Sequence, residues 1–152
     1  MIQAESRINV QGLTDYEIVQ TMDAFVCDLI TYLDQDLAAY PGTLQGYAPE
    51  SYTVYSAFQN GSPVCEGYAR TTMLLLNDFH IKTDFLIGDC YNGGGHAWNM
   101  VYLDDAWYHL DVCWNDGSQT KDYFLVSDDF MDQSRTWDRS IYPVSAMQNY
   151  KY

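Results

Sequence analysis

Residues 96–113 read His-Ala-Trp-Asn-Met-Val-Tyr-Leu-Asp-Asp-Ala-Trp-Tyr-His-Leu-Asp-Val-Cys, and this stretch decides the fold. Two runs rich in aromatic and aliphatic residues, 96–103 and 106–113, are separated by the pair Asp104-Asp105. Runs of this kind on either side of two turn-forming residues predict a β-hairpin with a two-residue turn. The pairing places Leu103 opposite Ala106 and fixes every earlier pair of the hairpin.

The predicted hairpin brings four side chains to one face, because alternate residues of a strand project from the same side. These residues are His96, Trp98, Asp111 and Cys113. His96 and Asp111 become diagonal neighbours with backbones about 7–8 Å apart, a distance that an imidazole and a carboxylate can span. An aspartate that accepts the proton of one ring nitrogen fixes the tautomer and leaves the other nitrogen for a nucleophile. The hairpin therefore predicts a histidine–aspartate pair of the catalytic type.

A candidate nucleophile, Cys65, follows the chain break at residues 60–63. Downstream residues at helical spacing share one face with Cys65, so a helix is predicted to begin at or just before it, with the cysteine on the buried side. A helix N-terminus stabilises a thiolate, and an adjacent imidazolium adds to that effect. The backbone N–H of Cys65 is a candidate oxyanion donor. A second donor is left open among three upstream residues: Tyr52, Tyr55 and Gln59.

The remaining elements surround this constellation. Thr14 and Glu17 form a capping box, which predicts a helix of about 25 residues that ends at Pro41-Gly42. A short helix capped by Ser51, strands over 82–87 and 123–126, and a glycine-rich loop over 89–95 are also expected. Residues 127–129 are read as a turn or helix start. Helices followed by strands favour an α+β fold in a single domain over residues 1–152.

Composition limits the function. The chain has 152 residues and a formal net charge of −14, which disfavours nucleic acid and anionic membrane surfaces as partners. Hydrophobic residues make up 47 %, enough for a buried core, but no apolar run approaches the ~18 residues that cross a bilayer. Residues 1–10 lack a basic segment followed by an apolar stretch, so a signal peptide is not expected.

The cysteines at 27, 65, 90 and 113 form no Cys-x-x-Cys pair, which disfavours a structural zinc site. Their low density also disfavours a disulfide framework. We expect no cofactor, and no calcium-loop pattern is present. Two alternatives stay open: a metal site built from Cys90, His96 and Cys113, and oxidation of Cys113 with Cys65 or Cys90. Cys27 is read as a partly exposed thiol without a function.

Three blocks, in this order, resemble the bacterial transglutaminase-like superfamily: Val-Cys-Glu-Gly-Tyr-Ala at 64–69, Gly-His-Ala-Trp-Asn at 95–99 and Trp-Tyr-His-Leu-Asp-Val at 107–112. The segment 123–128 is similar to one that often follows. The resemblance implies a papain-like α+β core in which the cysteine helix packs on an antiparallel sheet. It also implies Cys65 as nucleophile, His96 as general base and acid, and Asp111 as orienter. Cys113 departs from the pattern by standing where threonine is common.

The resemblance implies a cysteine enzyme that acts on peptide or carboxamide bonds through a thioester. Hydrolysis is favoured over crosslinking, since no sequence feature marks an amine-acceptor pocket. The alternative is a catalytically silent binding or scaffold module of a cell-surface protein, suited to basic peptides or cell-wall material. By resemblance, an extracellular or surface location is favoured, with the cytoplasm left open.

Four further residues have expected roles. Tyr68 and Trp98 are expected to line the substrate cleft. His109 is read as structural, because no nucleophile is assigned near it. His80 is read as a helix-end residue, since a partial positive charge is favourable there.

Overall fold

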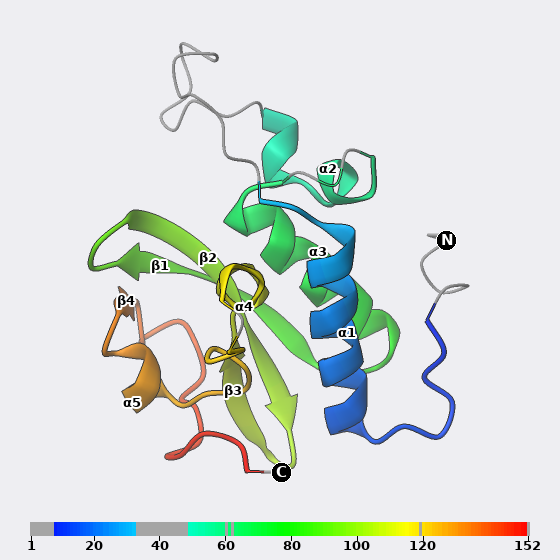
Figure 1. The fold of residues 1–152 in the computed structure, drawn as a ribbon. Helices are drawn as coiled ribbons and strands as arrows, with labels where there is room; N and C mark the ends of the chain where they lie inside the picture. Colours follow the sequence, from blue (N-terminus) through cyan, green and yellow to red (C-terminus); the bar gives the residue numbers. More distant parts are fainter. Residues whose placement is uncertain (1–7, 33–48, 60, 62, 119, 152) are drawn as a thin grey trace.

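The computed structural model of the protein describes residues 8–32, 49–59, 61, 63–118 and 120–151 (Figure 1). Helices of the first half precede strands, which confirms the predicted α+β class. The elements, in chain order, are α1 (Asp15–Leu29), a 3-10 turn η2 (Pro49–Tyr52), α2 (Val54–Gln59), α3 (Cys65–Asp78), β1 (Thr83–Cys90), β2 (Gly94–Leu103), β3 (Ala106–Leu110), α4 (Val112–Gly117), α5 (Asp128–Met131) and β4 (Arg135–Trp137).

Helix α1 begins at the predicted capping box and is shorter than predicted. The Thr14 hydroxyl accepts from the N–H of Glu17 at 3.3 Å, and the Glu17 carboxylate accepts from the N–H of Thr14 at 2.8 Å. The helix has 15 residues because Ile30 is extended, and the N–H of Thr31 donates to the Gly61 carbonyl at 2.6 Å. The predicted continuation through residues 33–42 lies outside the described residues.

The sheet has four antiparallel strands in the order β3-β2-β1-β4. The β2–β3 register is the predicted one, with Leu103 facing Ala106. Asp104 and Asp105 both have positive φ, 48° and 62°, as a tight hairpin turn of this type requires. The β2–β3 ladder ends at the pair Asn99–Leu110, so the predicted strand over 106–113 is too long.

Asp111 ends the third strand because it caps a helix instead. Its carboxylate accepts from the N–H of Trp114 at 3.1 Å, and α4 begins at the next residue. Aspartate is strongly preferred at a helix N-cap, and here that preference wins over strand extension. Cys113 consequently lies on α4, and its predicted position opposite His96 is wrong.

Other boundaries also differ from the prediction. Strands β1 and β2 run to Cys90 and from Gly94, so the predicted loop over 89–95 is a short turn. Residues 123–126 are not a strand, although Val126 forms an isolated bridge with His109. Ser51 lies within η2, and Thr53 rather than Ser51 accepts a backbone hydrogen bond in the first turn of α2.

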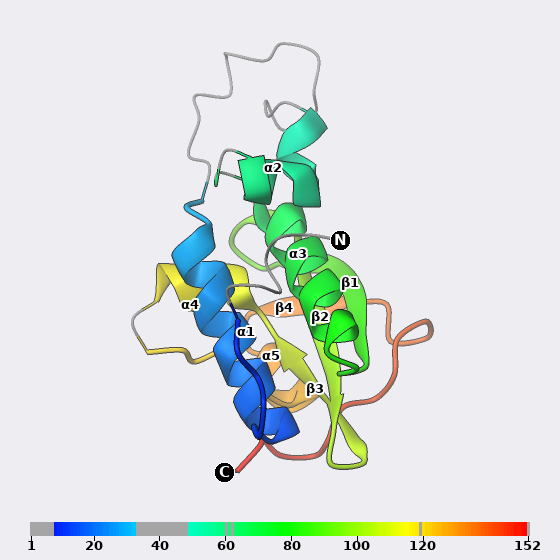
Figure 2. The same cartoon turned by 90° about the vertical axis from the view of Figure 1, so that its right-hand side faces the viewer.

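Both faces of the sheet are covered. Figure 2 looks onto α1 and α3, which lie in front of the sheet, with β4 and α5 behind it. The helix-side core contains Met22 of α1, Leu76 of α3 and Val101 of β2. The opposite core contains Leu86, Trp98, Met100, Val126, Met131 and Trp137. In the described part of the chain, no helix is long and apolar enough to cross a membrane.

Candidate active site

Cys65 is the first residue of α3, as the sequence predicts. Val64 before it is extended, with φ −90° and ψ −178°, and donates its N–H to the Ser51 carbonyl at 2.9 Å. Cys65 is half-buried rather than fully buried, and it lines two cavities. Backbone N–H groups at a helix start lack intrahelical partners and stabilise negative charge, which suits a thiolate.

Gly67 lets the start of α3 approach the preceding segment closely. A Cβ atom at Gly67 would lie 2.3 Å from the Cβ of Pro63 and 3.1 Å from the Ser51 carbonyl oxygen. Atoms at such distances overlap, so any larger residue would displace the helix start that carries Cys65.

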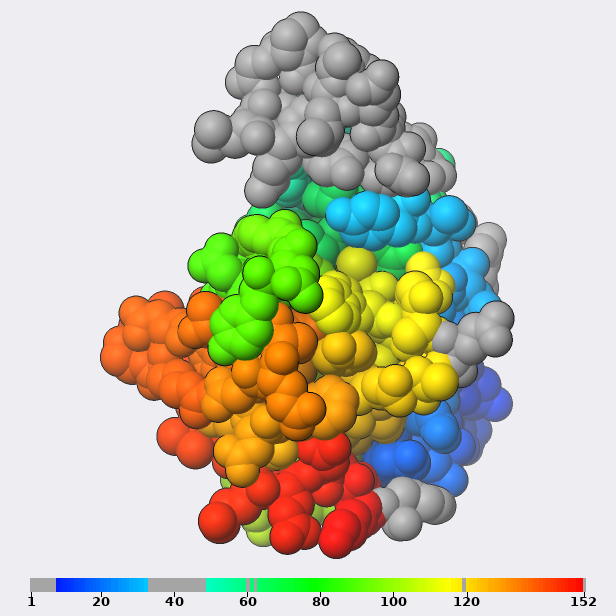
Figure 3. Space-filling view, turned by 60° about the vertical axis from the view of Figure 1, so that its left-hand side comes forward, coloured from blue at the N-terminus to red at the C-terminus, as the bar shows by residue number. Residues whose placement is uncertain are grey.

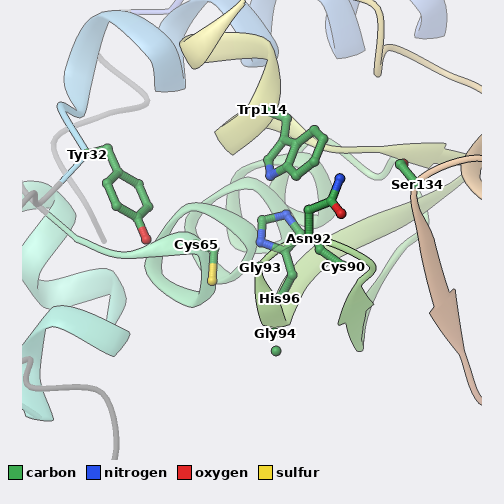
Figure 4. Close-up of a pocket in the computed structure, with 10 residues that line it drawn as sticks. Tyr32, Cys65, Cys90, Asn92, Gly93, Gly94, His96, Trp114 and Ser134 are labelled. Atoms are coloured by element: carbon green, nitrogen blue, oxygen red, sulfur yellow. The ribbon is translucent and has the colours of Figure 1, made fainter.

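His96 and Asp111 are brought together as predicted. His96 Nε2 lies 2.8 Å from Asp111 Oδ2, in a buried position. The other nitrogen, Nδ1, is then the one available to the cleft, where Figure 4 shows the imidazole beside Cys65. Burial opposes protonation, but Asp111 and Cys65 outweigh it and raise the pKa of His96 to about 9. Burial likewise opposes ionisation of Asp111, but His96 and Arg135 outweigh it and lower its pKa.

Arg135 is the site residue that the sequence did not predict. Its fully buried guanidinium donates from Nη1 to Asp111 Oδ2, the same oxygen that contacts His96. The guanidinium carbon also lies over three aromatic rings, at 4.2, 4.7 and 5.1 Å from the ring centroids of Trp114, Tyr123 and Trp98. A buried cation over aromatic faces is stabilised electrostatically, so this cage holds a positive charge directly behind Asp111.

Trp98 lies beneath the site rather than in its wall. It is 1 % exposed, and its ring stacks on His96 with centroids 5.8 Å apart and an interplanar angle of 21°. Its Nε1–H donates to His109 Nδ1 at 3.0 Å. His109 therefore carries its proton on Nε2, which donates to Asp128 Oδ1 at 2.8 Å. Burial lowers the pKa of His109 despite that carboxylate.

Tyr68, which was also expected in the cleft, is buried in the helix-side core. Its hydroxyl donates to Asp116 Oδ2 at 2.6 Å, which ties α3 to α4. The structure thus places both predicted cleft residues, Tyr68 and Trp98, under the site as support. Both are large aromatic residues whose polar atoms find hydrogen-bond partners, and this is the usual condition for burying them.

The cleft consists of two cavities that meet at Cys65 and His96. The larger has a volume of about 390 Å³, and Figures 3 and 4 show the segments around it: the β1–β2 turn, α4 and the chain after α1. The smaller, about 110 Å³, includes Tyr52 in its wall. Tyr55, another candidate oxyanion donor, is 64 % exposed. The larger cavity is lined by Tyr32, Cys65, Cys90, Asn92, Gly93, Gly94, Gly95, His96, Trp114 and Ser134.

All four cysteines are free thiols. Burial raises the pKa of Cys90 and of Cys113. Burial also raises the pKa of Cys27 to about 11, although Lys121 Nζ lies 3.0 Å from its sulfur. Within the described residues, no group of three or more His, Cys, Asp or Glu side chains could hold a metal ion. The alternative site of Cys90, His96 and Cys113 is therefore not formed.

Comparison with known proteins places this geometry in a family. The sequence profile of the Transglutaminase-like superfamily matches residues 3–112. No curated protein shows significant similarity to the chain. One similar solved structure is a candidate cysteine protease from Cytophaga hutchinsonii, with 14 % identity, a TM-score of 0.45, and coverage of 62 % of this chain and 30 % of that one. Another is a TGase, with 16 % identity, a TM-score of 0.48, and coverage of 72 % and 35 %. The chain thus spans about a third of the length of these two proteins.

Proposed function

This chain belongs to the transglutaminase-like superfamily, and we propose that it is a cysteine-nucleophile enzyme that cleaves peptide or carboxamide bonds through a thioester at Cys65. The observation that carries the proposal is the 2.8 Å contact between His96 and buried Asp111, with Cys65 at a helix start beside them. A nucleophile and a base at the junction of two cavities, with an orienting carboxylate buried behind the base, form the arrangement that acyl transfer requires.

The first half of the proposed reaction forms the thioester. The Cys65 thiolate attacks the substrate carbonyl carbon, and the backbone N–H of Cys65 faces the developing oxyanion at the helix start. The C–N bond then breaks, and protonated His96 gives its proton to the leaving amine or ammonia. Asp111 holds the imidazole in one orientation and stabilises its protonated form.

The second half releases the acyl group. Neutral His96 takes a proton from a water molecule, whose oxygen attacks the thioester carbonyl and expels the Cys65 thiolate. The products are a carboxylic acid and the regenerated cysteine–histidine pair. We propose water rather than an amine as acceptor, because no sequence feature marks an amine-acceptor pocket, and the smaller cavity, about 110 Å³, has room for water beside His96. A peptide or protein is the proposed substrate.

The test is covalent labelling with a peptide-acyl electrophile, followed by mass-spectrometric mapping of the modified residue. We expect one adduct at Cys65 in the wild type and none in Cys65→Ala. Cys27→Ser is the matched control, because Cys27 is also half-buried and lies outside both cavities. Equal labelling of the wild type and Cys65→Ala would refute the proposal. A wild type that binds basic peptides, and does so equally after Cys65→Ser without forming any adduct, would favour the binding module.

A further inference from the structure

Among the described residues, the junction of the two cavities contains one residue besides the proposed nucleophile and base. Cys65, Gly95 and His96 line both the 390 Å³ and the 110 Å³ cavity. A substrate chain with groups in both cavities would pass this junction and therefore Gly95.

Gly95 is open toward the space where such a chain would run. Outside its chain neighbours Gly94 and His96, a Cβ atom built on Gly95 meets no atom of the described residues within 4 Å, and Gly95 has ordinary strand geometry opposite Asp89. Gly88 on the neighbouring strand differs, because a Cβ there would lie 2.3 Å from the Thr136 carbonyl oxygen. The fold therefore requires glycine at 88 and does not require it at 95.

Apart from the proposed Cys65–His96 pair, the described residues in the wall of the larger cavity are uncharged. Among the described residues in its wall are the rings of Tyr32 and Trp114, the amide of Asn92 and the hydroxyl of Ser134, with no Asp, Glu, Lys or Arg. This neutrality is local, since the chain as a whole carries a charge of −14. An ionised substrate group buried here, away from the Cys65–His96 pair, would lose hydration without gaining an ion-pair partner among these residues.

We propose that the substrate is an extended peptide-like chain that crosses Gly95 and places an uncharged residue in the larger cavity, with the missing side chain at Gly95 providing its passage. This inference rests on the proposed function. A methyl group at 95 would project into the path and displace the scissile carbonyl from Cys65. A displacement of about 1 Å can lower the rate about 100-fold.

The experiment compares two electrophiles on the wild type and two variants. The small probe is iodoacetamide. The long probe is an uncharged dipeptidyl vinyl sulfone with a phenyl group beyond the reactive carbon, so that it extends to both sides. Gly95→Ala is compared with Gly117→Ala, because a Cβ at Gly117 on α4 also meets nothing within 4 Å and lies outside both cavities.

We expect Gly95→Ala to slow Cys65 modification by the long probe at least about 30-fold. Modification by iodoacetamide should stay within about twofold of the wild type, and the melting temperature should not change. Gly117→Ala should match the wild type with both probes. In the wild type, replacing the uncharged dipeptide with one that carries glutamate should slow labelling about tenfold or more.

Four outcomes would overturn the inference. Equal long-probe rates in the wild type and Gly95→Ala would show that nothing crosses residue 95. Equal slowing of both probes would show that the methyl group disturbs the Cys65–His96 pair itself. A wild type that reacts selectively at Cys65 with a one-sided peptide-acyl probe, yet never with the long probe, would overturn the passage and leave the proposed function standing. Failure of every probe at Cys65 would overturn both.

Discussion

Replacing Arg135 with methionine removes the cation behind Asp111 while keeping an apolar side chain in the cage. The Arg135 side chain is 0 % exposed and Asp111 is 1 % exposed, so the substitution leaves a buried carboxylate with one cationic partner fewer. Removing one member of a buried ion pair typically costs about 3–5 kcal/mol. Asp111 keeps His96 and the N–H of Trp114, which favours the lower end, about 3 kcal/mol.

The cost should depend on pH, because His96 becomes the remaining cation. The pKa of His96 is raised to about 9 in the folded protein, above an ordinary value of about 6.5. A raised histidine pKa gives stability that is complete below about pH 6.5 and is lost as the pH rises through about 9. Once His96 has lost its proton, Asp111 has no cationic partner in Arg135→Met, whereas in the wild type it keeps Arg135. The difference between variant and wild type should therefore grow from about pH 6.5 to about pH 9.5.

Urea unfolding at both pH values measures this difference as a free energy of unfolding. About 3 kcal/mol corresponds to a melting temperature lower by about 9 °C for a chain of this length. Arg139→Met is the matched control: its side chain is 47 % exposed and pairs with Asp128 at 3.3 Å, and an exposed pair contributes less than about 1 kcal/mol. Equal stability of Arg135→Met and the wild type, or a loss that shrinks at high pH, would refute the reasoning.

Three other substitutions test the supporting structure, each by thermal unfolding. Gly67→Ala should cost about 1–3 kcal/mol, because its Cβ would overlap Pro63, and unchanged stability would contradict the close approach. Thr14→Ala should cost about 1 kcal/mol through loss of the capping box, whereas Thr14→Ser should restore most of it. His109→Phe should cost about 2 kcal/mol, since the indole N–H of Trp98 loses its buried acceptor; a neutral result would show that water replaces it.

The hairpin and the contact between His96 and Asp111 could be predicted because local rules fix them. The residue pair at 104–105 sets the register, and the register sets the faces on which His96 and Asp111 project. The predicted contact between His96 and Asp111 is present although β3 ends earlier than predicted, because a side chain at a helix N-cap can still reach its diagonal neighbour. The helix start at Cys65 was equally local, since a break and an apolar stripe define it.

The rest could not be predicted because it depends on tertiary contacts. Arg135 lies in a three-residue strand, which is too short to show alternation, and nothing in its neighbourhood distinguishes it from a surface arginine. The predicted hairpin placed Trp98 on the correct face of the sheet. Whether that face is buried depends on α5 and β4, which pack against it. An alternating sequence pattern shows from which face of a strand a side chain projects. The segments that pack against that face decide whether solvent reaches the side chain.

The two carboxylate oxygens of Asp111 have different roles, one in the fold and one in the electrostatics of the site. Oδ1 caps α4, the helix that carries the Trp114 wall, while Oδ2 contacts His96 and Arg135. Exchanging Oδ2 for an amide nitrogen, as in Asp111→Asn, leaves a cap acceptor in place and deletes the negative charge. Under the proposed function, one atom therefore separates an active site from an inactive one of the same shape, and such a domain could pass from catalysis to binding alone without a change in its groove.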